Sequence, residues 1–264
     1  MIANYADMWA DVARGLTAVS MWSRLGWRDA RLRYQRTIIG PFWTTLSLGL
    51  FVVMLGIIWS HLWKQDPKTY IPFVSSGMIA WAMLSTITVE GTSVFVTAQT
   101  LIRELPTSYT MLACALVWRN LIAFGHNSII YVAVCLYAGV HLSWSMFLIV
   151  PALVLMCLNG IWISLVLGLA CVRFRDIQQL VTTILQVALF VTPIFWSPRQ
   201  LSGSLAAFEQ YNILYHYVAI VRDPLLGQTP ALGSWLMVVL ATFLGWGMML
   251  ALYSRFRRRI PYWL

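Results

Sequence analysis

The chain has 264 residues, of which 60% are hydrophobic and only 10% are charged, with a mean hydropathy of +0.74. A soluble domain could not cover so much apolar surface, so the composition excludes a soluble protein and predicts an integral membrane protein. The net charge is +9, and the basic residues, almost all arginine, occur in short clusters between apolar runs. This pattern is typical of membrane topology and argues against nucleic-acid binding.

An amphipathic helix is predicted at the start of the chain. Apolar residues recur there at helical spacing, opposite Asp7, Asp11 and Arg14. The apolar set is Tyr5, Met8, Trp9, Val12, Leu16, Val19 and Trp22. Such a helix lies in the membrane interface, and the alternative is a helix packed on soluble protein. We therefore expect residues 1–36 to form a cytoplasmic interface segment, without a cleaved secretory signal because no uninterrupted apolar core is present.

Four arginines come just before the first long apolar run, partly within the sequence RYQRTIIGPFW of Arg33 to Trp43. A Gly40-Pro41 pair follows and can break the incoming helix and turn the chain into the bilayer. The sequence thus puts dense positive charge where the first span begins. The four arginines are Arg28, Arg31, Arg33 and Arg36.

Six membrane spans are predicted from the apolar runs, since a spanning helix needs about 20 predominantly apolar residues. The uncharged stretch from Asn120 to Val172 is too long for one helix and is divided near Gly139. The expected fold is an all-α integral membrane protein, with one domain over residues 1–264 and its spans within residues 43–253. The spans are Trp43–Leu62, Ile71–Ala98, Tyr109–Ala138, Met146–Cys171, Ile177–Trp196 and Leu232–Tyr253.

Both ends of the chain are expected on the cytoplasmic side. An even number of spans places them together, and the N-terminal segment and the tail at residues 254–264 are rich in arginine. This asymmetry follows the positive-inside rule. The basic residues expected to face outward are Lys64, Lys68, Arg199 and Arg222.

Two ionisable residues, Glu90 and Arg119, lie within predicted spans. A charge in a span is costly, so such residues are functional candidates by default. The alternatives are a structural ion pair inside the protein, or an Arg119 side chain that reaches the cytoplasmic surface.

The segment at residues 197–231, between the fifth and sixth spans, is too apolar for a free loop and too often interrupted by proline and charge for a span. A pair of short re-entrant helices, shielded from lipid by the rest of the protein, would satisfy its backbone groups. We therefore expect short helices on the outer face.

No catalytic constellation is apparent in the sequence. A P-loop ends in Gly-Lys-Ser/Thr, but the lysines here are Lys64, after Trp63, and Lys68, after Pro67. The four histidines are scattered, Glu90 is the only carboxylate in the spans, and the four cysteines have no close pairing. We therefore expect no enzymatic activity, no metal and no cofactor on this chain.

Aromatic residues make up 14% of the chain, and many lie near span ends, where an interfacial belt is expected. Others could line a pore, because aromatic rings pack on the C–H faces of sugars. The belt and the protein core are the alternatives for each of them. The pore candidates are Trp59, Phe190, Phe195 and Trp196.

Four separated segments resemble the type-2 ABC transporter permeases that export polysaccharides, specifically the O-antigen and capsule exporters. The first is RYQRTIIGPFW, described above. The others are RFRDIQQLVTTILQVALFVTPIFW at 173–196, NILYHYVAIVRDPLLGQTP at 212–230 and RRRIPYWL at 257–264. The resemblance covers essentially the whole chain in the family's order. One departure is Asn212-Ile213, where the family usually has Asn-Pro, and it concerns the geometry of the outer turn.

The resemblance implies a homodimer of six-span subunits in a bacterial inner membrane, with two ABC ATPase subunits that bind ATP and Mg on its cytoplasmic face. The substrate would be a polysaccharide attached to undecaprenyl pyrophosphate. Its diphosphate is expected among the arginines, because guanidinium groups bind phosphate oxygens bidentately, and aromatic residues would surround the entrance. The alternative is that the arginines only fix topology and contact anionic lipids. The entrance residues would be Arg28, Arg31, Arg33, Tyr34, Arg36, Phe42 and Trp43.

The same resemblance implies two further sites. A coupling helix at Leu101 to Ser108 would sit in a cleft of the ATPase, and a shorter inner loop would follow the fourth span. The ATPase-coupling residues would be Leu101, Arg103, Glu104, Leu105, Arg173, Arg175 and Asp176. The outer segment would close the channel, through Tyr211, Tyr215, Tyr217 and Arg222.

Three competing interpretations remain at the level of the sequence. One is a type-2 ABC permease for teichoic acid, a drug or haem, and another is a purely structural membrane protein. The third is a membrane glycosyl- or acyltransferase, which would need a constellation of acids or histidines that Glu90 and four scattered histidines do not supply. A neighbouring gene for an ABC ATPase would favour transport.

Overall fold

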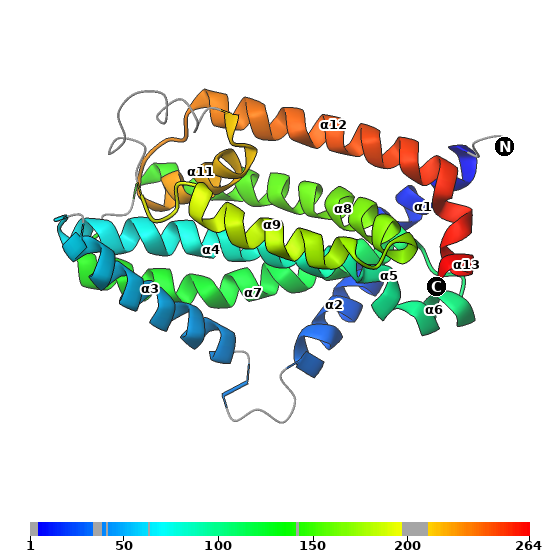
Figure 1. Ribbon diagram of the computed structural model, residues 1–264, viewed down its shortest axis with the longest axis horizontal. Helices are drawn as coiled ribbons and strands as arrows, with labels where there is room; N and C mark the ends of the chain where they lie inside the picture. The colour runs from blue at the N-terminus through cyan, green and yellow to red at the C-terminus, as the bar shows by residue number, and fades with distance from the viewer. Residues whose placement is uncertain (1–4, 34–38, 41, 63, 141–142, 197–210) are drawn as a thin grey trace.

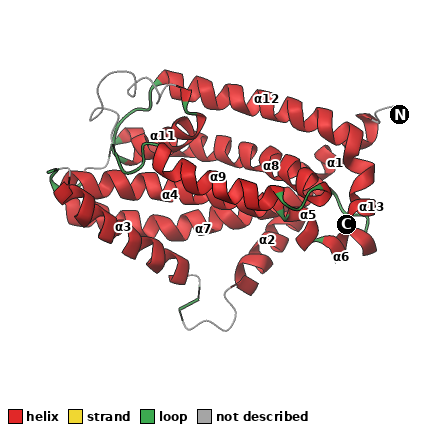
Figure 2. Ribbon diagram, viewed as in Figure 1, coloured by secondary structure: helices red, strands yellow, loops and turns green. Residues whose placement is uncertain are grey.

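The computed structural model describes residues 5–33, 39–40, 42–62, 64–140, 143–196 and 211–264, and the helices in these ranges pack into an elongated bundle (Figure 1). Within the described ranges the regular structure is entirely helical (Figure 2). The all-α prediction is confirmed.

Five described helices are long and apolar enough to cross a membrane. They are α3 (Phe42–Leu62), α4 (Pro67–Thr92), α7 (Tyr109–Ala138), α8 (Ile149–Arg173), preceded by the 3-10 turn η1 (Trp144–Leu148), and α12 (Leu232–Phe256). The predicted fifth span is the apolar helix α9 (Ile177–Val191), which has only 15 residues and ends before a turn at Thr192. Five of the six predicted spans therefore have membrane length, and α9 is shorter than the usual span of about 20 residues.

Helix α4 lies at the centre of the bundle, in contact with α3, α7, α8, α9 and α11. Close approach of the helices depends on small residues, as is usual in membrane bundles. A Cβ atom added at Gly160 of α8 would lie 3.0 Å from side-chain carbons of both Ile87 and Val117, on α4 and α7. Gly160 thus marks the point where α4, α7 and α8 meet.

The two ends of α4 are set locally. Asp66 caps the first turn by accepting a hydrogen bond from the Lys68 amide at 3.0 Å, and Pro67 occupies the first helical position, where its missing N–H costs nothing. The helix was expected to continue to Ala98, but it ends at Thr92. Two short helices follow the break at Ser93: α5 (Val94–Thr97) and α6 (Gln99–Glu104).

The N-terminal segment forms two helices, α1 (Tyr5–Thr17) and α2 (Val19–Arg33), instead of one. The expected division of α1 into an apolar face and a polar face is wrong at one residue. Asp11 is only 1% exposed, whereas the apolar side chains of Tyr5 and Trp9 are largely exposed. The helix packs on α7 with Asp11 facing inward, because that carboxylate has hydrogen-bond partners there.

The chain returns to the same end of the bundle at its C-terminus, where η3 (Arg257–Arg259) and α13 (Ile260–Trp263) lie near α1 and α6 (Figure 1). We call the end formed by α1, α6 and α13 the basal end. The far end carries helix α11 (Ile213–Leu225).

Helix α11 lies in the segment predicted to be re-entrant and is mostly buried against α4, α8 and α12. The expected first part of this segment, residues 197–210, is outside the described residues. Asn212 caps α11 by accepting hydrogen bonds from the amides of Leu214, at 3.0 Å, and Tyr215, at 3.4 Å. Ile213 is therefore the first helical residue, a position that suits proline equally well. The departure from the family's Asn-Pro is compatible with the same helix start.

Candidate functional sites

A cluster of charged residues joins α2, α4 and α7 around Glu90. The Glu90 carboxylate accepts hydrogen bonds from Arg33, from Arg119 Nη2 at 2.6 Å and from Asn120 Nδ2 at 2.8 Å. Arg119 Nη1 also lies 3.7 Å from the Asp29 carboxylate. The two ionisable residues noticed within predicted spans thus form an ion pair, and Arg33, from the arginine-rich segment, completes it.

One side of this cluster faces a cavity of about 410 Å³ between α2, α3 and α7, which we call the α2–α3–α7 cavity. Its ten described lining residues include three arginines and no carboxylate. The cavity lies beside the first turn of α3, where the Phe42 ring packs edge-on against the His126 ring with centroids 5.8 Å apart. It is lined by Trp27, Ala30, Arg31, Arg33, Thr44, Arg119, Asn120, Ile122, Ala123 and His126.

The five predicted entrance residues that the structure describes separate into three groups. Arg31 and Arg33 line the α2–α3–α7 cavity. Arg28 is bound to Asp29 at 3.4 Å and lines, with Arg33, Glu90 and Arg119, a second cavity of about 510 Å³ that extends to the start of α6. Phe42 and Trp43 are exposed at the first turn of α3. The remaining two, Tyr34 and Arg36, are outside the described residues.

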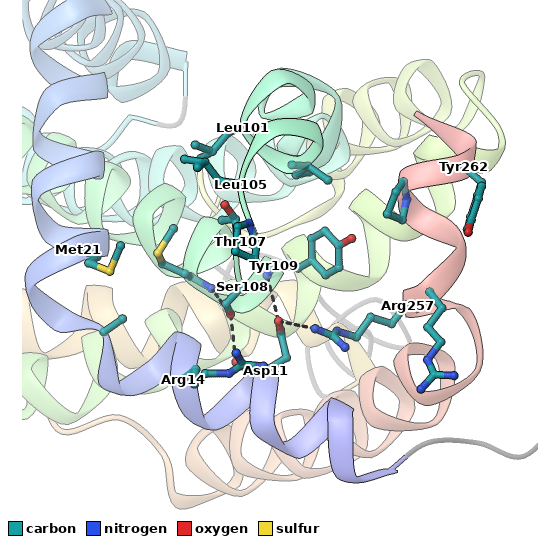
Figure 3. Close-up of a pocket in the computed structure, with 16 residues that line it drawn as sticks. Asp11, Arg14, Met21, Leu101, Leu105, Thr107, Ser108, Tyr109, Arg257 and Tyr262 are labelled. Carbon is teal, nitrogen blue, oxygen red and sulfur yellow. Dashed lines mark hydrogen bonds and ion pairs between the residues drawn. The ribbon is translucent and has the colours of Figure 1, made fainter.

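A larger pocket of about 970 Å³ opens at the basal end, and Figure 3 shows the residues that line it. Its walls come from α1, from α6 and the following loop, and from the C-terminal turn. Leu101 and Leu105, two of the predicted coupling residues, line it, and Leu105 is exposed. Arg103 and Glu104 are also exposed, on the same short helix.

Asp11 holds the wall of this basal pocket together (Figure 3). Its carboxylate accepts hydrogen bonds from the amides of Tyr109 and Thr110, each at 3.3 Å, and from the Thr110 hydroxyl at 3.0 Å. The Tyr253 hydroxyl donates at 2.8 Å and Arg257 Nη2 at 3.1 Å. One carboxylate therefore caps the start of α7 and binds α12 and the C-terminal turn to α1.

The role of Asp11 could not be recognised from the sequence, because a helical wheel assigns this residue to the polar face of α1. The available signal was Gly15, four residues later on the same face of α1. A Cβ atom at Gly15 would lie 2.5 Å from Thr110 Cβ, so α1 and α7 approach each other closely at this point. Because Asp11 lies one turn before Gly15, its carboxylate is on the face of α1 that contacts α7.

The second predicted coupling loop lies between α8 and α9. Arg173, Arg175 and Asp176 are all exposed there. Arg173 extends over the Phe174 and Trp263 rings, 5.6 Å from each ring centroid. None of the three is among the described residues that line the basal pocket, so the two predicted coupling segments form separate surfaces.

Comparison with known proteins settles the class of the molecule. Residues 21–226, more than half of the chain, match the family described as ABC-2 type transporter. The chain belongs to this family. It is also 24% identical over 170 residues to the O-antigen export system permease protein RfbA of Myxococcus xanthus. That alignment covers 64% of this chain and 65% of the Myxococcus protein, slightly less than two thirds of its length.

The pore candidates of this ABC-2 type transporter differ in exposure within the chain. Phe190 is exposed, whereas Phe195 is 3% exposed and stacks on Trp59 with centroids 6.5 Å apart. Trp196 Nε1 donates to the Phe190 carbonyl at 3.1 Å. Phe195 is therefore a core residue of the subunit, in accordance with the alternative given for each aromatic.

The residues expected to form the outer gate also separate. Tyr211 is exposed and Tyr215 is half-buried. Tyr217 is buried and donates to Asn159 Oδ1 at 2.6 Å, so its hydroxyl is engaged in an internal hydrogen bond. Arg222 is also buried: Nη1 donates to the Pro193 carbonyl at 2.8 Å and Nε to Asp223 at 3.2 Å. The bond to Pro193 holds α11 against the turn that follows α9.

Proposed function

We propose that this ABC-2 type transporter is the permease subunit of an exporter that moves an undecaprenyl-pyrophosphate-linked polysaccharide, O-antigen or capsule, across the bacterial inner membrane. The observation that carries the proposal is the arginine-lined cavity beside the first turn of α3. The similarity to a protein named as an O-antigen export permease supports the same substrate class.

The headgroup of such a substrate carries two phosphates and must leave the inner leaflet before transport. Arg28, Arg31 and Arg33 stand before the first span, with Arg36 after them in the sequence. One guanidinium group can bind two phosphate oxygens at once, and it is more weakly hydrated than the ammonium group of lysine. The exposed rings of Phe42 and Trp43 would contact the isoprenoid chain at the entrance.

The ATPase would dock at the basal end. Membership of the family implies an ABC ATPase partner, and the basal pocket offers a concave surface beside α6. Exposed Leu105 and the charged side chains of Arg103 and Glu104 would contact the partner, with Arg173, Arg175 and Asp176 as a second contact. ATP and Mg would be bound by the ATPase, and two ATPases would serve a homodimer of this chain.

Within that homodimer the exposed aromatic residues are the candidates for contact with sugar. Phe190 on α9 and Tyr211 before α11 both present most of their ring surface outside the subunit. Trp59 stacks on the buried Phe195 and Trp196 donates to the Phe190 carbonyl, so both would support that surface.

Deletion of the gene tests the function directly. Cells would be fractionated, and surface polysaccharide would be followed by glycan immunoblotting. Trapping of full-length polymer on the cytoplasmic side is expected. Truncated or absent polymer would instead indicate a biosynthetic role, and normal surface polymer would indicate a different substrate for the transporter.

Complementation then tests the entrance and the docking surface. Replacement of Arg33 and Arg36 by lysine keeps the charge but removes the guanidinium fork, so normal membrane insertion with lost export is expected. Full export by the lysine variants would contradict the assignment of these arginines to the substrate entrance. A crosslinking scan of residues 101–108 is expected to capture the ATPase, and a scan that never does so would reject this docking surface.

A further inference from the structure

The α2–α3–α7 cavity contains groups that the sequence did not connect with the arginine-rich segment. Arg119, Asn120 and His126 come from α7, and Thr44 comes from α3. We propose that this cavity is the diphosphate subsite for the lipid-linked substrate, with Arg31 and Arg119 as its phosphate-binding residues. The inference rests on the proposed function and assigns its headgroup to one place in the fold.

The charge of the cluster favours an anion in this cavity. Four arginines, Arg28, Arg31, Arg33 and Arg119, surround two carboxylates, those of Asp29 and Glu90. Both carboxylates line the second cavity and are absent from the described lining of the α2–α3–α7 cavity. The wall that faces the α2–α3–α7 cavity therefore keeps a net positive charge, which a diphosphate would neutralise.

Glu90 positions two of these cations without occupying the cavity. It binds Arg119 Nη2 at 2.6 Å and also binds Arg33, so it fixes both guanidinium groups between the two cavities. Fixed donors bind an anion with less loss of conformational entropy than mobile side chains.

The size and depth of the cavity agree with a lipid headgroup. Its volume of about 410 Å³ lies within the range of about 300–1,000 Å³ found for small-ligand sites. The wall includes the apolar residues Trp27, Ile122 and Ala123 as well as the cations. Because the cavity adjoins the first turn of α3, a membrane-length helix, it lies at the level expected for the headgroups of one leaflet.

Binding to the complete permease–ATPase complex tests the subsite. The complex would be placed in phosphatidylcholine nanodiscs, and affinity would be measured for undecaprenyl pyrophosphate, with undecaprenol, inorganic pyrophosphate and phosphatidylglycerol as separate probes. The test variants are Arg31→Ala and Arg119→Lys, which keeps the positive charge opposite Glu90. The matched control is Arg24→Ala, an exposed arginine of the same helix α2 that is absent from both cavity linings.

We expect each test variant to weaken binding of undecaprenyl pyrophosphate about tenfold or more, and the control to leave it unchanged. Thermal unfolding of each variant verifies that the fold is kept. If Arg119→Lys unfolds, Arg31→Ala decides alone, because Arg31 is exposed and its replacement should leave the fold intact.

Two other outcomes would overturn the subsite in different ways. Tight binding that is unaffected by both variants places the headgroup elsewhere and leaves the proposed function standing. Equal binding of phosphatidylglycerol or inorganic pyrophosphate would show a general anion site. If wild-type complex does not distinguish undecaprenyl pyrophosphate from undecaprenol, the proposed function itself fails, and the subsite fails with it.

Discussion

Asp11 and Glu90 are both carboxylates that bind arginine and join three segments of the bundle, but their surroundings differ. Asp11 is enclosed, with a side chain 1% exposed and five hydrogen bonds from other residues. Glu90 is 16% exposed, and its partner Arg33 is 42% exposed between two cavities. A closed ion cluster can only hold helices together, whereas an open one also offers its cations to a ligand. The comparison therefore separates an enclosed, structural cluster from the open cluster beside the cavity that we propose as a binding site.

The largest effect is expected for Asp11→Ala. This change leaves Arg257, Tyr253 and the first amides of α7 without their buried acceptor, and loss of one partner of a buried ion pair costs about 3–5 kcal/mol. The thermal unfolding midpoint of the purified protein should fall sharply. Asp7→Ala, on the exposed side of the same helix, is the control. Equal midpoints for the two variants would contradict the structural role of Asp11.

Glu90→Gln is expected to have a smaller effect on stability. Glutamine keeps the size and one acceptor, but the charge that holds Arg33 and Arg119 is lost, at a cost of about 1–3 kcal/mol. Water in the adjoining cavities can partly solvate the two arginines. The midpoint of unfolding should lie between those of wild type and Asp11→Ala. A drop as large as that of Asp11→Ala would mean that the Glu90 cluster is equally structural.

Two neighbouring arginines of the C-terminal turn test the importance of enclosure directly. Arg257 binds the buried Asp11 at 3.1 Å, and Arg258 binds the exposed Asp7 at 2.7 Å. Arg257→Ala should cost about 1–3 kcal/mol, because Asp11 then loses its charged partner but keeps its other donors. Arg258→Ala should leave the unfolding midpoint almost unchanged, because surface ion pairs contribute little. A larger fall of the unfolding midpoint for Arg258→Ala than for Arg257→Ala would show that the length of the ion pair matters more than its burial.

The smallest effect is expected from titration of Asp7. Its hydrogen bond with Arg258 holds the pKa of the carboxyl below its ordinary value of 3.8. Because the pKa is lower in the folded state, the contribution to stability is present above pH 3.8 and is lost as the pH falls through the folded pKa. The small stability difference between wild type and Asp7→Asn should therefore be constant near neutral pH and vanish only in acid. A difference that disappears near pH 6 would point to another group.

Much of the fold could be predicted from local patterns. Apolar runs of sufficient length identified α3, α4, α7, α8 and α12, because a spanning helix must satisfy its own backbone hydrogen bonds in lipid. The exceptions lie where packing competes with a pattern: α4 ends at Thr92 instead of Ala98, and α9 has only 15 residues.

The candidate sites could be predicted only in part, because charges separated in the sequence meet only after folding. Glu90 and Arg119 were noticed for their cost in a span, and Arg33 for its place beside the first span. These three side chains meet only because α2 and α4 pack on α7, and the spacing of residues along one helix does not predict which helices pack together.

The sequence by itself determined the membrane class, the helix positions and the arginine-rich segment, because hydrophobic length and charge act locally along the chain. Tertiary structure alone decided that Asp11 is buried, that Tyr217 and Phe195 face inward, and that Arg31, Arg33 and Arg119 share one cavity. The physical reason is that burial and ion pairing depend on which helix faces approach each other, and in this bundle small residues such as Gly15 and Gly160 set those approaches.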